Sequence, residues 1–211
     1  TSTGDAVCEA RTITFDPAAS LATDDGDLLL DATEGIVATG ISATGGTAIL
    51  RTTNGTITAP VANSAIAAGA LILEAADGIG SLETGTPLAV TAATLAFATT
   101  DGDVSLRAVD GTTVGAVSNV SLTRLLHTGA VTTETIARAT SQAGGTGNLH
   151  LQATNAPLTI ANSATGAMLS TGGTGNVLLH TTSDARDGGA GIVLDGSIET
   201  AGGAVSVDAA D

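Results

Sequence analysis

A five-residue motif recurs seven times along the chain: a glycine, a small or acidic residue, an apolar residue, any residue and a second apolar residue. Gly26-Asp-Leu-Leu-Leu and Gly102-Asp-Val-Ser-Leu are two copies, and the full set begins at Gly26, Gly46, Gly69, Gly102, Gly147, Gly175 and Gly203. We call it the Gly motif. A turn glycine that feeds a strand of period two, many times over, indicates a solenoid. The sequence therefore predicts an all-β fold, a parallel β-helix or β-solenoid.

The motif copies are unevenly spaced, with intervals of 20, 23, 33, 45, 28 and 28 residues. A solenoid tolerates this because extra residues leave the stack as loops. We expect the interval of 45 to contain two coils, and the last coils to hold about three short strands each. The whole chain then forms roughly eight to ten coils, stacked about 4.8 Å apart. Residues 1–23 fit the motif poorly and are expected to be an N-terminal cap or an irregular first coil, followed by solenoid repeats over 24–211.

Composition agrees with a narrow aliphatic core. Apolar residues make up 43% of the chain, charged residues 13%, and Phe15 and Phe97 are the only aromatic side chains. Regularly placed Leu, Ile and Val argue against low-complexity disorder, and 28 glycines argue against a helical fold. The lone Cys8 rules out an internal disulfide framework and is expected to be a buried or incidental thiol. Asn54 and Asn119 begin glycosylation sequons, which are frequent by chance in a Thr-rich chain.

The charge balance excludes two kinds of partner. The formal net charge is −15, from 21 acidic and six basic residues. Such a chain repels nucleic acid and anionic membrane surfaces. It also contains no run of eighteen apolar residues, so we expect no membrane insertion.

Strand alternation divides the motif side chains between core and surface. It places Leu28 and Leu30, and their equivalents in other copies, inward. The last outward position is then occupied by opposite charges in the first three copies, Asp31, Arg51 and Glu74, which predicts a structural ladder with Arg51 between two carboxylates. Asn148 and Asn176 hold equal places in consecutive copies, so we expect their amides to stack as a second ladder.

The preceding outward position is aliphatic in the same three copies, Leu29, Ile49 and Ile72. We call these residues the apolar row. A loop or neighbouring segment that covers the row is the preferred explanation. The alternative is an interaction surface for another chain or for another part of a longer protein.

Acidic turns are the candidates for a metal, above all Asp25-Gly-Asp27 and Asp101-Gly-Asp103. Carboxylates around a turn glycine can bind calcium. The nonapeptide pattern of calcium-binding β-rolls fails here, because Leu149 and Val177 stand where its aspartate should be. Solvated turn residues are the preferred interpretation, so no metal site is assigned and calcium at these turns stays a weak alternative.

Catalytic groups are sparse. Polysaccharide-active β-helix enzymes need a base beside clustered carboxylates and aromatic platforms for sugar rings. This chain has no Lys, Trp or Tyr, and its histidines are scattered at His127, His150 and His180. His150 and His180 fall on successive coils at different outward positions, so a shared site requires a diagonal approach, and solvent-facing histidines are the preferred reading. No catalytic or cofactor-binding residue is assigned, and a polysaccharide-active enzyme remains only a second alternative.

Three motif copies carry a family resemblance: Gly102-Asp-Val-Ser-Leu-Arg-Ala-Val-Asp-Gly, Gly175-Asn-Val-Leu-Leu-His-Thr and Gly203-Ala-Val-Ser-Val-Asp-Ala. They resemble the repeats of filamentous-haemagglutinin-like and autotransporter-like surface proteins of Gram-negative bacteria. The resemblance implies an exported, right-handed solenoid that serves as an extracellular adhesin, stalk or filament. The Asn-Pro-Asn-Gly element of the two-partner secretion domain is absent, so these residues would be a piece of the shaft.

Two functions follow from these observations. The first is an extracellular structural or adhesive shaft, without catalysis, whose partners are further repeats of the same chain or a host or cell-surface glycan. The second is a subunit that self-associates end to end or side by side into a filament or surface layer, because an uncapped coil offers unpaired backbone groups.

Overall fold

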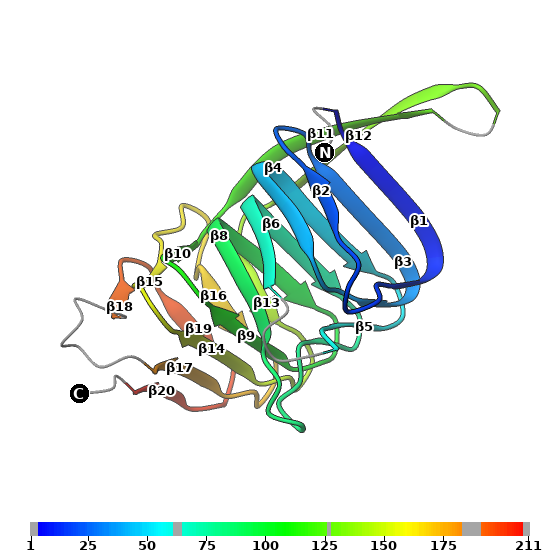
Figure 1. Ribbon diagram of the computed structural model, residues 1–211. Helices are drawn as coiled ribbons and strands as arrows, with labels where there is room; N and C mark the ends of the chain where they lie inside the picture. Colours follow the sequence, from blue (N-terminus) through cyan, green and yellow to red (C-terminus); the bar gives the residue numbers. More distant parts are fainter. Residues whose placement is uncertain (1–3, 61–64, 126–127, 183–190, 209–211) are drawn as a thin grey trace.

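The chain folds into a β-solenoid of about 8 turns, as the Gly motif predicts. The computed structural model describes residues 4–60, 65–125, 128–182 and 191–208. Eighteen strands form one continuous parallel stack, and two more form an antiparallel hairpin on its outside (Figure 1). The described residues contain no helix that is long and apolar enough to cross a membrane.

The first half of the solenoid uses long strands that bend at the corners. The strands are β1 (Ala6–Thr14), β2 (Leu21–Thr23), β3 (Leu28–Val37), β4 (Ile41–Thr52), β5 (Thr56–Thr58), β6 (Ala65–Ala75) and β7 (Gly78–Ile79). β1 stacks on β3 in parallel, with a register shift between Ala10 and Thr12. The poor fit of the first residues to the motif thus coincides with an irregular strand at the end of the described stack.

The second half uses short strands, and its coils have three each, as the spacing predicts. After β8 (Leu88–Thr99) come β9 (Val104–Ala108), β10 (Thr112–Val114), β13 (Ser141–Ala143), β14 (Leu149–Ala153), β15 (Leu158–Ile160), β16 (Leu169–Thr171), β17 (Val177–Thr181), β18 (Ile192–Leu194), β19 (Ile198–Thr200) and β20 (Val205–Asp208). Each set of three stacks in register on the set before it.

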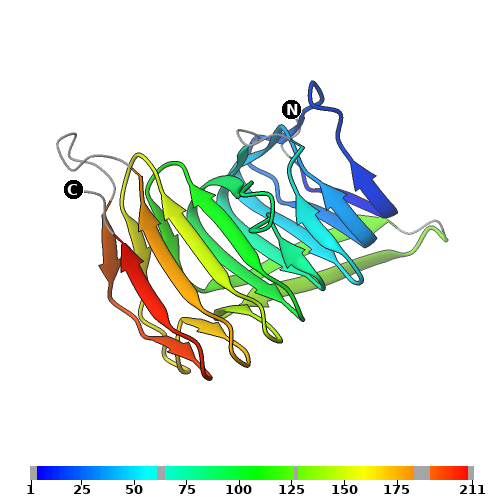
Figure 2. The same ribbon diagram turned by 90° about the horizontal axis from the view of Figure 1, so that it is seen from below.

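The interval of 45 residues does not contain two coils. It contains one coil and the antiparallel hairpin of β11 (Val117–Leu125) and β12 (Val131–Arg138). β10 pairs with β8 at Thr94 and Leu95, and β13 pairs with the same strand at Ala98. The hairpin therefore leaves the stack at the position of Ala96 and runs back along the outside of the earlier coils, past β1 (Figures 1 and 2).

The seven Gly motifs form two stacks, whereas a single stack was expected. In the first, Leu28 pairs with Ala48 and Ala48 with Leu71. Leu95 of β8 continues this stack without a motif glycine. The second begins at Val104, which pairs with Ile79 of β7, and continues through β14, β17 and β20. From Gly102 on, the motif lies on another face of the solenoid, because Leu95–Thr99 already occupies the first face in that coil.

Close stacking of the corners explains why glycine is kept in the motif. A Cβ on Gly147 would lie 2.2 Å from the carbonyl oxygen of Gly102, and one on Gly203 would lie 1.9 Å from that of Gly175. Inward threonines complete these corners. The Oγ1 atoms of Thr23 and Thr52 each donate a 2.7 Å hydrogen bond to a glycine carbonyl three residues later. A buried backbone acceptor is satisfied in this way.

Candidate functional site: a strapped face with an ion-pair network

The hairpin covers the apolar row. Leu29, Ile49 and Ile72 each have 0% relative exposure and belong to a cluster separate from the main core. The cluster is completed by a small residue of β8 and four side chains of the hairpin: Ala96, Val117, Val120, Leu122 and Ile136. A neighbouring segment thus covers the row, as the preferred explanation required. The alternative of an interaction surface for another chain does not fit, because no part of the row is accessible.

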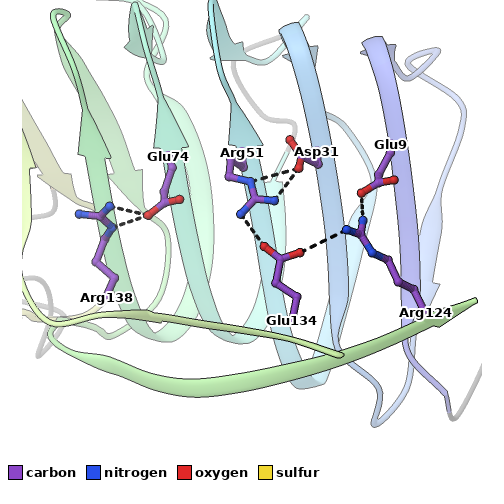
Figure 3. A network of polar contacts seen from close by, with 7 residues as sticks. All are labelled: Glu9, Asp31, Arg51, Glu74, Arg124, Glu134 and Arg138. Carbon is purple, nitrogen blue, oxygen red and sulfur yellow. Dashed lines mark hydrogen bonds and ion pairs between the residues drawn. The ribbon is translucent and has the colours of Figure 1, made fainter. Parts of the chain in front are cut away.

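Beside the apolar row, ion pairs join the hairpin to the coils (Figure 3). Arg51 of β4 donates from Nη2 to Asp31 of β3 at 2.5 Å and from Nη1 to Glu134 of β12 at 2.9 Å. Glu134 also lies 3.8 Å from Arg124 of β11, which pairs in turn with Glu9 of β1. Charges therefore alternate from the first coil, through the hairpin, to the third.

The expected ladder of Asp31, Arg51 and Glu74 is present in register but differs in its contacts. Arg51 stands opposite Asp31 on one side and Glu74 on the other. Its guanidinium binds Asp31, whereas Glu74 pairs with Arg138 of β12. The second carboxylate is thus taken by a hairpin arginine, because β12 passes directly over this position (Figure 3).

This network is partly withdrawn from water. The side chains of Arg51, Glu74, Glu134 and Arg138 are 23–29% exposed. Hydrogen bonding to Asp31 and then to Glu134 raises the pKa of Arg51 above its ordinary value, although burial acts in the opposite direction. Partly buried pairs with several hydrogen bonds contribute more than isolated surface pairs and fix the register of the segments that they join.

A polar groove of about 660 Å³ lies at the foot of the hairpin. Three charged side chains and several uncharged hydrogen-bonding groups line the groove: Arg51, Glu74, Arg138, Thr100, Gln142 and Ser170. The small residues Ala98, Gly144 and Gly172 border the same space. The groove offers hydrogen bonds to a polar ligand, and both of its arginines already have carboxylate partners.

The amide ladder is confirmed and extends further than expected. Asn176 donates from Nδ2 to Oδ1 of Asn148 at 3.1 Å, and Asn148 donates in the same way to Asp103 at 3.1 Å. Each acceptor oxygen also receives the backbone N–H of the next coil. The side chain after the motif glycine thus accepts a backbone hydrogen bond from the coil that follows.

The same role explains the acidic turns. Asp27 accepts the backbone N–H of Thr47 at 2.7 Å, just as Asp103 accepts that of Asn148. Among the described residues, no group of three or more His, Cys, Asp or Glu side chains is placed to hold a metal ion. The weak alternative of calcium at these turns stays untested.

Two histidines do approach each other. The rings of His150 and His180 have centroids 6.4 Å apart, and Nδ1 of His180 lies 3.2 Å from Asp208. The diagonal approach is therefore real, although both side chains remain partly open to solvent. The third histidine, His127, lies outside the described residues. Cys8 is a free and exposed thiol, so of the two expected states, buried or incidental, it is not buried.

Sequence reasoning missed the hairpin and its charged residues Arg124, Glu134 and Arg138. A local signal was present. Alternating runs at 120–125 and 131–138 flank the turn residues Thr128 and Gly129, a pattern typical of a hairpin. Gly129 has a φ of +83°, as such a turn requires.

The fold and this face define a β-solenoid repeat protein whose first coils are strapped by an inserted hairpin. Comparisons with protein-family models, with curated protein sequences and with solved structures find no match.

Proposed function

We propose that this protein is an extracellular shaft: a rigid, elongated spacer in a bacterial surface protein of the filamentous-haemagglutinin-like or autotransporter-like kind. The observation that carries the proposal is the hairpin of β11 and β12, which lies across the first coils. A hairpin from the middle of the sequence braces the first coils through the apolar cluster and three arginines. A solenoid whose coils contact only their neighbours bends and frays more readily than one with such a brace.

Composition supports an extracellular location. An acidic surface with very few basic residues and a single cysteine suits a protein that stays soluble without reducing conditions. Adhesion would use the groove at the foot of the hairpin, where Gln142, Ser170 and Arg138 offer hydrogen bonds to the hydroxyl or carboxyl groups of a glycan.

The experiment has two parts. Antibodies raised against the purified protein are expected to label intact source cells as strongly as permeabilised ones. Labelling that requires permeabilisation would overturn the surface location. In negative-stain electron microscopy, the purified protein is expected to form discrete short rods whose length does not depend on concentration.

A second candidate is end-to-end assembly, favoured by the exposed valines of the last described strand. Val205 and Val207 of β20 are 47% and 48% exposed, and β20 pairs only with β17 among the described strands. β1 likewise pairs only with β3. A coil of a second copy, like a further coil of the same chain, would satisfy both edges. Filaments that lengthen with concentration would favour this candidate over a monomeric shaft.

A further inference from the structure

Three polar side chains from successive coils meet on the outer face of β14, β17 and β20. Asp208 stands opposite His180 in the strand register, and His180 stands opposite Gln152. His150, two residues before Gln152, is therefore the diagonal neighbour of His180. The ring centroids of the two histidines lie 6.4 Å apart.

Asp208 fixes the orientation of His180. Its Oδ2 lies 3.2 Å from Nδ1 of the ring. An ionised carboxylate only accepts hydrogen bonds, so Nδ1 of His180 is the donor in this pair, and in the neutral form of the ring the lone pair is then on Nε2. A histidine held by a carboxylate in this way is the common arrangement of a metal ligand with its supporting partner.

From these contacts we propose that His150 and His180 form a binding site for a divalent transition-metal ion, with Asp208 positioning His180. A metal–nitrogen distance of about 2.0–2.1 Å and a tetrahedral angle at the ion place the centroids of two ligating rings about 5 Å apart. The observed separation is 6.4 Å, so the two side chains must rotate toward each other to bind one ion. Imidazole ligands suit Zn²⁺, Ni²⁺ and Cu²⁺, of which Cu²⁺ binds most tightly.

The site differs from the calcium alternative in ligand type and place. It uses nitrogen ligands on the strand face, whereas the acidic turns offer oxygen at the corners. Water fills the remaining coordination positions, because the described residues place no third histidine, cysteine or carboxylate as a direct ligand. A bound ion would join the coil of β14 to that of β17 and hold them together.

The test is a titration of the 211-residue protein with Cu²⁺, in a Cys8→Ser background because that thiol is exposed and would bind or reduce copper. Calorimetry gives the affinity and stoichiometry, and electron paramagnetic resonance reports imidazole nitrogen at the ion. We expect one ion per chain, with micromolar affinity. His150→Gln and His180→Gln should each weaken binding by about ten-fold or more and remove one nitrogen from the spectrum.

Asp208→Asn should weaken binding by about ten-fold, because it acts through His180 and does not touch the ion. His127→Gln is the matched control and should leave the affinity unchanged. Thermal unfolding without metal shows whether each variant is folded. Affinity unchanged by both His150→Gln and His180→Gln, or lost in His127→Gln, would overturn the proposal.

Discussion

Arg51 and Glu134 are separated by 83 residues in the sequence and joined by a hydrogen bond of 2.9 Å. The same guanidinium binds Asp31 in the neighbouring coil. Arg51 therefore ties two coils and the hairpin at one point. In a double-mutant cycle of Arg51→Met and Glu134→Gln, we expect a coupling energy of about 1 kcal/mol, since the pair is partly buried. Midpoints of chemical unfolding measure it, and strictly additive effects would contradict it.

The apolar row should make a large contribution to stability. Ile49 has 0% exposure beneath the hairpin. We expect Ile49→Ala to destabilise the protein by about 3 kcal/mol, from lost burial and the cavity left behind. Thr133→Ala on the outer side of the hairpin is the control, with an expected change of about 0.5 kcal/mol or less. Equal effects of the two substitutions in urea unfolding would mean that the hairpin does not hold the row.

We expect substitution of a corner glycine, even by alanine, to destabilise the protein. A Cβ on Gly147 meets the carbonyl oxygen of Gly102 at 2.2 Å, whereas one on Gly191 meets nothing within 4 Å. We expect Gly147→Ala to cost about 3 kcal/mol, because the two backbones must separate, and Gly191→Ala to have little effect. Thermal unfolding monitored by circular dichroism compares the two variants directly. A tolerated Gly147→Ala would show that the corners stack more loosely.

The stability of the protein should depend on an amide side chain at position 148 of the amide ladder. Asn148 donates to Asp103, so Asn148→Asp brings two carboxylates together and should destabilise the protein by about 1–3 kcal/mol at neutral pH. Acidification should restore part of this loss. Asn176→Asp is the matched control, because its neighbour in the ladder is an amide, and the expected loss is smaller. Melting temperatures across a pH series test both expectations.

His150 should make stability depend on pH. Burial lowers its pKa in the folded protein below the value of 6.5 for the exposed side chain. The unfolded chain then binds more protons between the folded pKa and 6.5, so stability falls as the pH drops through this window and is complete above it. His150→Gln should flatten the profile there. An unchanged profile in His150→Gln would contradict the assignment.

Local alternation was enough to predict the solenoid, the inward residues and the amide ladder. Leu149 and Leu151 face the core, as do Leu28 and Leu30, because the period of a strand fixes the side of each side chain. The ladder of Asn148 and Asn176 followed from an equal place in copies one coil apart. Such relations depend on neighbours in the stack, which spacing reveals.

Relations between distant segments could not be predicted in the same way. The partners of the apolar row and of Glu74 lie on the hairpin, between 45 and 107 residues later. No periodicity links the two segments, because the hairpin crosses the strands at a steep angle (Figure 3). The shift of the motif from one face to the next was hidden for a related reason: Leu95 occupies the first face without a preceding motif glycine.

The hairpin also makes the first and the last described coils unequal under load. A pull on the last described coil is opposed only by the pairing between stacked strands, and these pairings can break one after another. A pull on the first coil must break the bond between Glu9 and Arg124 and lift the hairpin before the next coil can follow. Tension applied at the N-terminal side should therefore meet a high first barrier, and tension at the other side a series of low ones.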